Sequence, residues 1–201
     1  MVDASLYRSP FEGHTLGERP ARDGSIGVLV RANLVPSAVL VSTWVSGEAP
    51  LQAALAQLLG QAPPGPTGQT LATQLGLLMR TGPEEWLLIG DVAGDPYPVL
   101  RAAIGADVGG VTDLSHARCR IKVQGPSCLD TLSKLFALDC RPAAFPVGEL
   151  RLSGHHHLPC SLHRQGETEF DLYVFTTYAH DQLASLLDAA LEYGVKLEGI
   201  R

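Results

Sequence analysis

Strand-like segments in this chain occur in pairs, and most pairs are followed by a helical segment. Alternating or continuous apolar runs predict strands at 26–30, 38–45, 75–80, 85–89, 108–113, 118–124, 148–152, 157–163 and 169–175. Leucines at helical spacing follow at 51–59, near 129–135 and at 183–191. A doubly wound parallel fold needs single strands alternating with helices. The repeated ββα order therefore predicts an α+β fold with antiparallel sheets.

The pattern also suggests where the folded part begins. Residues 1–24 are polar, rich in Gly, Pro and Arg, and have no periodicity, which predicts a flexible N-terminal arm. Regular patterning starts at Ser25, so 25–201 is predicted as the folded domain, with two subdomains at about 25–105 and 106–201 as the alternative. The Pro-rich stretch 61–68 can be neither a helix nor a central strand.

Composition excludes several classes of protein. Hydrophobic residues make up 45% and charged residues 18% of the 201 residues, which excludes intrinsic disorder. A formal net charge of −6 argues against a general nucleic-acid binder. The charged fraction is below the usual quarter, which suggests that part of the surface is covered by a partner.

The N-terminus and the cysteines indicate the compartment. The N-terminus has no basic segment followed by an apolar run, and no apolar run approaches the ~20 residues that a membrane span needs. The four cysteines contain no C-x-x-C pair, so zinc and thioredoxin-type spacings are missing. These features predict a reduced, cytoplasmic protein without a membrane partner.

Common signatures of cofactor binding and catalysis are missing. The chain has no G-x-G-x-x-G, no G-x-x-x-x-G-K-[ST], no H-E-x-x-H and no G-x-S-x-G. Together these absences argue against a self-sufficient enzyme. We therefore assign no catalytic, cofactor-binding or metal-binding residue from the sequence.

Histidines form the most conspicuous cluster. If His155, His157 and His163 lay in one strand, they would share a face and two of them could bind Zn²⁺ with a third ligand from elsewhere. The favoured alternative is a polar hairpin turn after Ser153-Gly154 with solvated imidazoles.

Asp113, Ser115 and His116 have the residue types of a catalytic triad. Triad members converge from separate elements, so their closeness in the sequence favours a different role. We expect Asp113 and Ser115 to cap a turn through hydrogen bonds to nearby backbone N–H groups.

Residues 118–124 (R-C-R-I-K-V-Q) are predicted to form a two-faced strand. Cys119, Ile121 and Val123 share one face, and the cations occupy the other. Arg118, Arg120 and Lys122 are therefore candidate contacts for a partner or for an anion such as a carboxylate or phosphate. An ordinary solvated sheet face is the alternative.

Several segments resemble one known family. They are 82–88 (G-P-E-E-W-L-L), 113–118 (D-L-S-H-A-R), 137–148, 162–164 (L-H-R), 170–174 (F-D-L-Y-V) and 189–194 (A-A-L-E-Y-G). In order and spacing they resemble the gamma-subunit family of heterotetrameric sarcosine oxidase, from about Thr81 to Gly194. Departures are Leu135-Phe136, where many members have Gly-Cys, and His155-His156-His157, where an Ala-Gln-Thr-like stretch is common.

The resemblance implies a fold like the folate-binding domain of the glycine-cleavage T-protein. It also implies a cytoplasmic complex with alpha, beta and delta subunits, in which other subunits carry FAD, FMN, NAD and zinc. That complex demethylates sarcosine oxidatively to glycine, with tetrahydrofolate as the one-carbon acceptor. The gamma subunit is expected to be a non-catalytic assembly subunit that binds no cofactor itself.

Two alternatives remain open at this stage. One is the equivalent subunit of an N-methylglutamate dehydrogenase-like enzyme. The other is a stand-alone folate-binding, aminomethyltransferase-like protein, which normally needs a longer chain than 201 residues. Fold does not determine function, so sarcosine as the substrate rests on the resemblance.

Overall fold

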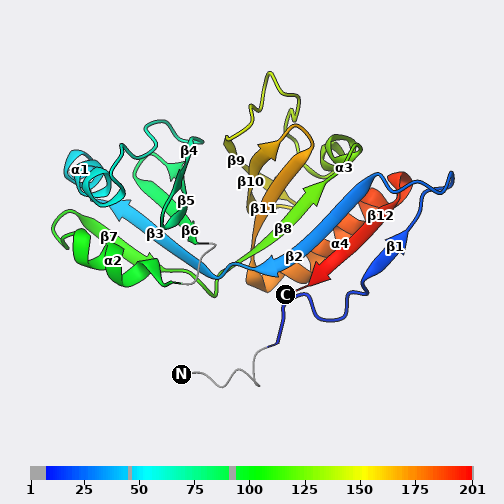
Figure 1. Cartoon of the computed structure of the whole chain (residues 1–201), viewed down its shortest axis with the longest axis horizontal. Helices are drawn as coiled ribbons and strands as arrows, with labels where there is room; N and C mark the ends of the chain where they lie inside the picture. Colours follow the sequence, from blue (N-terminus) through cyan, green and yellow to red (C-terminus); the bar gives the residue numbers. More distant parts are fainter. Residues whose placement is uncertain (1–7, 45–46, 91–93, 201) are drawn as a thin grey trace. The chain divides into compact units, whose positions relative to one another are not determined.

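Strand pairing organises the chain into two sheets, each in a compact unit of its own (Figure 1). The computed structural model describes residues 8–44, 47–90 and 94–200. The seven-stranded unit comprises Met1–Leu34, Cys119–Val147 and Ser153–Arg201, and the five-stranded unit comprises Val35–Arg118 and Gly148–Leu152. The α+β class predicted from the sequence is confirmed.

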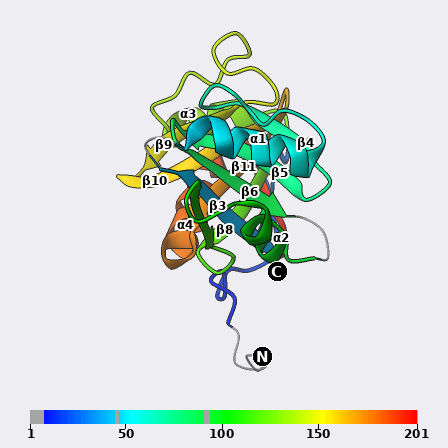
Figure 2. The same cartoon turned by 90° about the vertical axis from the view of Figure 1, so that its left-hand side faces the viewer.

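The five-stranded unit has the sheet order β4-β5-β6-β3-β7, with every neighbouring pair antiparallel. Its elements are β3 (Ser37–Thr43), α1 (Glu48–Leu59), β4 (Thr70–Thr73), β5 (Gly76–Gly82), β6 (Glu85–Gly90), α2 (Pro96–Ala103) and β7 (Gly109–Asp113). Helix α1 ends at Gly60, whose φ of 70° lies in the left-handed region that favours glycine. Figure 2 shows α1 and α2 in front of this sheet. The predicted strand 38–45 forms β3, and its Val45 lies outside the described residues.

The seven-stranded unit has the sheet order β1-β12-β2-β8-β11-β10-β9. Its elements are β1 (Gly17–Arg19), β2 (Val28–Leu34), β8 (Arg118–Gln124), α3 (Cys128–Leu135), β9 (Leu150–His155), β10 (Leu158–Gly166), β11 (Glu169–Phe175), α4 (Ala179–Ala190) and β12 (Val195–Ile200). The first residue of β8 and the first three of β9 are grouped with the five-stranded unit. Strands β2 and β12 pair in parallel, whereas β1–β12, β2–β8 and β10–β11 are antiparallel. The parallel pair is an exception to the antiparallel pattern predicted from the sequence.

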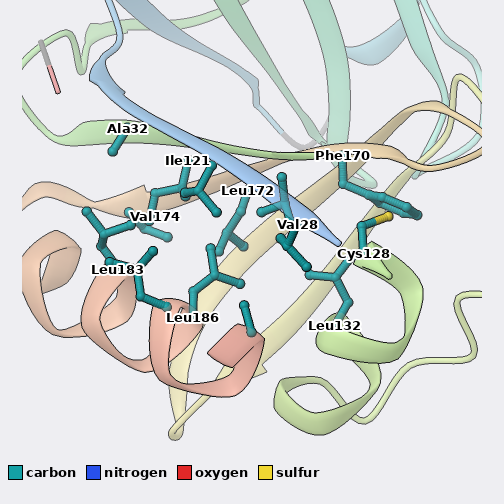
Figure 3. Packing of buried hydrophobic residues seen from close by; sticks show 14 of the residues in the cluster. Val28, Ala32, Ile121, Cys128, Leu132, Phe170, Leu172, Val174, Leu183 and Leu186 are labelled. Carbon is teal, nitrogen blue, oxygen red and sulfur yellow. The ribbon is translucent and has the colours of Figure 1, made fainter. Parts of the chain in front are cut away.

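Alternating apolar residues of the central strands pack against α3 and α4 (Figure 3). Val28, Ile121 and Leu172 come from three neighbouring strands and face Leu132 and Leu183 of the helices. All five side chains are fully buried, and each contributes roughly 1.5–3 kcal/mol of transfer free energy. This layer of helices on one face leaves the other face of the sheet for polar residues.

The described part of the predicted N-terminal arm, residues 8–24, is anchored to the seven-stranded unit. The Phe11 side chain is completely buried in the core, and β1 pairs antiparallel with β12, Gly17 opposite Leu197. The structure therefore corrects the expectation of a flexible arm for this part. A single buried aromatic residue and a strand of three residues produce no periodic pattern. The sequence therefore does not reveal that this segment is anchored. Residues 1–7 lie outside the described residues.

The boundaries of the two units differ from the predicted subdomains 25–105 and 106–201, because strands pair with segments that are distant in the sequence. Strand β2 joins the seven-stranded unit because its neighbours are β8 and β12, while β7 joins the five-stranded unit because it pairs with β3. None of the helices formed by the described residues has the length and apolarity to cross a membrane.

The two units repeat one order of elements. β3-α1-β4-β5-β6-α2-β7 in the first corresponds to β8-α3-β9-β10-β11-α4-β12 in the second. The sheet orders correspond as well, β4-β5-β6-β3-β7 against β9-β10-β11-β8-β2-β12, with β2 as an extra strand. The sequence predicts a repeated order of strands and helices, and the two units share the order of strands within their sheets as well.

A buried arginine occupies the hairpin of the seven-stranded unit. Arg164 is completely buried, and its Nη1 donates to the carbonyl oxygens of Cys140 (2.9 Å) and Phe145 (2.8 Å), while Nε donates to that of Gly166 (3.0 Å). Its guanidinium lies 5.1 Å from the ring centroid of Phe170. The side chain therefore ties the loop after α3 to the β10–β11 hairpin.

The five-stranded unit has an arginine at the equivalent position. Arg80 Nε donates to the carbonyl of Gly82 (3.2 Å), its terminal nitrogens donate to the carbonyl of Gly65 and to Glu48 Oε1, and the guanidinium lies 4.4 Å from the Trp86 ring centroid. Both hairpins have a register shift at the arginine. The Pro-rich segment 61–68 is thus held in place by a side chain rather than acting as a free linker.

Replacing Arg164 with Met should lower the free energy of unfolding by about 3–5 kcal/mol, because buried carbonyls that lose their donor cost roughly 1–3 kcal/mol each. Arg164→Lys should restore less than half of this loss, because an ammonium cannot reproduce the planar set of donors. Urea titration measures both. Arg141→Met, at a largely exposed arginine paired with Asp139, is the control and should change little. Equal effects of Arg164→Met and Arg141→Met would contradict the clamp.

Candidate functional site

Strand β8 has the two faces that its sequence predicts. Cys119, Ile121 and Val123 are completely buried in the core of the seven-stranded unit. The candidate contact residues lie on the opposite face and are half-buried: Arg118, Arg120 and Lys122.

Two of these cations face carboxylates of β11, the neighbouring strand. Lys122 Nζ lies 2.5 Å from Glu169 Oε1, and Arg120 Nη1 lies 3.9 Å from Asp171 Oδ2. Asp171 is completely buried. A buried carboxylate is unfavourable unless it is paired and hydrogen-bonded. Arg120 therefore stabilises the buried charge of Asp171, which gives this cation a structural role within its own chain.

A glutamine and a histidine of β10 extend this cluster. Gln165 Nε2 donates to Asp171 Oδ2 (2.9 Å) and lies 3.2 Å from His163 Nδ1. His163 stands directly opposite Asp171 in the β10–β11 register. Burial, with a smaller effect of the Lys122 charge, lowers the pKa of His163 to about 4, so the imidazole is neutral at neutral pH.

We call this surface the polar face of the seven-stranded sheet. It consists of Arg31, Arg120, Lys122, His163, Gln165, Glu169, Asp171 and Glu198. Arg31 stands opposite Lys122 in the β2–β8 register and forms an ion pair with Glu198 of β12 at 2.9 Å. Cations of the two neighbouring strands β2 and β8 therefore pair with carboxylates of the flanking strands β12 and β11, whereas the β8 sequence alone suggests a row of cations.

Arg118 belongs to the five-stranded unit. Burial lowers the pKa of its guanidinium, and the negative charge of Glu85 acts in the opposite direction. The sequence pattern did not single out Asp171, Glu169 and Gln165. The available signal is that two carboxylates two residues apart in β11 match two cations two residues apart in β8.

Asp113 and Ser115 cap a turn, as expected. Asp113 Oδ1 accepts hydrogen bonds from the backbone N–H (2.9 Å) and hydroxyl (2.6 Å) of Ser115, and these lower the Asp113 pKa. Ser115 Oγ in turn accepts from the Ala38 N–H at 3.2 Å. The hydroxyl donates to a carboxylate whose pKa is lowered, which makes Asp113 a weak base for activating Ser115 as a nucleophile.

The triple histidine forms a hairpin turn between β9 and β10. His156 and His157 have φ angles of 50° and 65°, the left-handed conformation of a two-residue hairpin turn. His155 ends β9 and is completely buried, which corrects the expectation that all three imidazoles are solvated. The three candidates His155, His157 and His163 lie in β9, the turn and β10, so they do not share one strand face.

Ser185 of α4 links the turn to the helix. Its Oγ lies 3.1 Å from His155 Nε2 and 2.7 Å from His156 Nε2. Burial, with a smaller effect of His156, lowers the pKa of His155 to about 4. Within the described ranges 8–44, 47–90 and 94–200, no three His, Cys, Asp or Glu side chains are grouped closely enough to hold a metal ion.

The four cysteines are buried free thiols. Burial raises the pKa of Cys128 to about 12 and that of Cys160 to about 11, and it raises the pKa values of Cys119 and Cys140 as well. Protonated thiols are poor nucleophiles and poor metal ligands.

Comparison with known proteins identifies the family. Residues 46–192 match the model of the sarcosine oxidase, gamma subunit family. The chain belongs to this family. It is 30% identical over 190 residues to sarcosine oxidase subunit gamma of Arthrobacter sp, covering 94% of this chain and 92% of that protein. Subunit gamma of Corynebacterium sp. (strain P-1) is 27% identical over 190 residues with the same coverage.

Solved structures agree with this assignment. The chain is similar to one in heterotetrameric sarcosine oxidase from Corynebacterium sp. U-96 in complex with pyrrole 2-carboxylate, with a TM-score of 0.76, 26% identity, and coverage of 94% and 96% of the two chains. The aminomethyltransferase T of the Bartonella henselae glycine cleavage system has a TM-score of 0.61 at 15% identity, covering 86% of this chain and 48% of that one. The latter shows a shared fold, as the family resemblance implies.

The family's sequence segments occupy structural positions in this gamma-family chain. The G-P-E-E-W-L-L segment turns from β5 into β6 and contains Trp86 of the arginine clamp. The L-H-R and F-D-L-Y-V segments lie on β10 and β11 and contain Arg164, Phe170 and Asp171. These motifs therefore carry hairpin packing and the polar face.

Acid should destabilise the protein through its two buried histidines. Their pKa values are lowered from 6.5 to about 4 on folding, so protons bind more readily to the unfolded chain. The contribution of the two neutral histidines to the free energy of unfolding is complete above pH 6.5 and is lost as the pH falls towards 4. Each histidine should account for roughly 2 kcal/mol of the loss between pH 7.5 and pH 5.

Urea titrations of His155→Gln and His163→Asn at both pH values test this. Each variant should be less sensitive to acid than the wild type, and the double variant should lose both contributions. An unchanged pH dependence in the double variant would contradict the assignment.

The two ion pairs of the polar face should differ in importance. Arg120→Met removes the cation beside a fully buried carboxylate and should cost about 3 kcal/mol of unfolding free energy. Lys122→Met, at a partly exposed pair, is the matched control and should cost less than about 1 kcal/mol. Equal losses in the two variants would show that burial of Asp171 does not matter.

Proposed function

We propose that this chain is a non-catalytic assembly subunit of a heterotetrameric flavoenzyme that oxidatively demethylates sarcosine to glycine, with tetrahydrofolate as one-carbon acceptor. Its partners are the alpha, beta and delta subunits. The observation that carries the proposal is the similarity to a chain of heterotetrameric sarcosine oxidase over 94% of this chain and 96% of that one. Family membership over residues 46–192 supports it.

The non-catalytic role is supported by the state of the reactive side chains. The Ser115 hydroxyl donates to Asp113, His155 and His163 are buried and neutral, and the thiol pKa values are raised. As the family resemblance implies, we assign FAD, FMN, NAD, zinc and tetrahydrofolate to the other subunits. The four buried thiols, all unpaired with one another, support a cytoplasmic location for the complex.

The polar face is proposed as a contact for a partner subunit. Lys122 and Glu169 are partly exposed there, with 28% and 39% of their side chains accessible. A surface with ordered charges of both signs favours a protein partner with complementary charges over a single small anion. Arg120 and Lys122 remain the candidate contacts on this face, and Arg118 is a candidate in the five-stranded unit.

Two alternatives have less support. A subunit of an N-methylglutamate dehydrogenase-like enzyme would retain the assembly role with a different substrate, but the curated relatives are sarcosine oxidase gamma subunits. A stand-alone aminomethyltransferase-like protein has less support because the similarity to aminomethyltransferase T, at 15% identity, shows a shared fold alone.

Co-expression with the alpha, beta and delta chains tests the proposal. The chain should co-elute with them, and the assembled enzyme should oxidise sarcosine. Ala substitutions at Ser115, His116 and His163, made one at a time, should each leave kcat within a few-fold of wild type in fully assembled enzyme. Loss of a positioned general acid or base would lower the rate by ~10²–10⁴. Such a loss in a fully assembled variant would make the subunit catalytic and refute the proposal.

A further inference from the structure

Strand β7 forms one edge of the five-stranded sheet. Trp44 N–H donates to the Val108 carbonyl (3.3 Å) and Leu114 N–H donates to the Ala38 carbonyl (2.7 Å), so the even-numbered residues of this segment bond to β3. Backbone groups alternate in direction along an antiparallel strand. The N–H and C=O groups of Val111 and Asp113 therefore point away from β3, and no strand of the described residues pairs with them.

The equivalent edge of the seven-stranded sheet is covered. There β12 occupies the position that β7 has in the repeat, and β1 pairs antiparallel with its outer side. An ion pair between Lys196 Nζ and Glu18 Oε1 (3.0 Å) joins the two strands. One copy of the repeated motif thus closes this edge with a short added strand, while the other copy leaves it open.

The surroundings of β7 have the features of a contact surface. The Trp44 side chain is 51% exposed, and its ring is held beside Gly110 by a hydrogen bond from Nε1 to the Ala106 carbonyl at 2.9 Å. Exposed Trp is among the residues that contribute most to binding free energy at protein interfaces. Exposed carboxylates stand near both ends of the strand, Asp107 before it and Asp113 at its end.

We infer that β7 accepts an extended segment of another subunit of the complex as an added antiparallel strand. That segment carries an apolar side chain against Trp44 and cationic side chains near Asp107 and Asp113. Main-chain hydrogen bonds to Val111 and Asp113 provide affinity, and the indole and the carboxylates provide selectivity. The identity of the partner as a subunit of the oxidase rests on the proposed function.

Hydrogen exchange of the full-length chain, alone and in the assembled complex, tests the inference directly. The amides of Val111 and Asp113 should exchange at least tenfold more slowly in the complex. The amides of Gly110 and Thr112 already bond to β3 in the free chain, so they are the internal control and should change much less. Unchanged exchange at Val111 and Asp113 in the complex would overturn the inference.

Variants provide a second test, with recovery of the co-expressed partner subunits as the readout. Val111→Pro removes an outward N–H, which an edge strand tolerates, and Trp44→Ser removes the exposed ring. Asp107→Lys reverses the charge at one end. Each should lower recovery at least several-fold. Leu152→Ser, at an equally exposed apolar residue (51%) of β9, is the control and should be recovered like the wild type.

The outcomes separate the two proposals. If the wild-type chain is not recovered with the other subunits, the proposed function fails and the inference fails with it. If the wild type and the Val111→Pro and Trp44→Ser variants are all recovered equally, only the inference is wrong. Melting curves of the free variants identify any that misfold, and exchange at Val111 in the wild-type complex then decides the question.

Discussion

A buried guanidinium stacked on an aromatic ring holds each unit of this protein together. Arg164 with Phe170 and Arg80 with Trp86 occupy equivalent hairpins, and each arginine donates to backbone carbonyls of a loop that has no regular structure. A buried cation is costly unless its donors are satisfied. The loop carbonyls satisfy them, so the loop, the hairpin and its register shift depend on one another. Without Arg164, the carbonyls of the buried residues Cys140 and Phe145 in the loop after α3 would lose this donor.

Repetition of this motif explains both the similarity and the difference of the two units. The same β-α-β-β-β-α-β order builds both sheets, but β2 enters the second between β8 and β12, and β1 then covers β12. Both additions come from the N-terminal segment. One sheet consequently has a covered edge and a polar face crossed by ion pairs, whereas the other ends at the open β7. A family whose members assemble with other chains can use such an open edge for association.

Most of the elements, and part of the site, could be predicted from the sequence. Period-two patterning identified β8 and its cationic face, and the Asp113–Ser115 turn follows from local hydrogen bonding alone. The partners of the cations could not be predicted, because Arg120 meets Asp171 only when β8 and β11 become neighbours. His155 was misjudged for the same kind of reason: a histidine beside a turn looks solvated until α4 packs over it and Ser185 binds its ring.

The sequence by itself determined the α+β class, the positions of most strands and helices, and the family. These properties depend on local periodicity, turn residues and motif order, all of which are present in the unfolded chain. Tertiary structure alone decided the parallel pairing of β2 with β12, the anchoring of Phe11, the pairing of cations with carboxylates on the polar face and the open edge at β7. Each of these depends on which distant segments become neighbours. Burial of the shared core determines which segments become neighbours, and no local sequence pattern predicts it.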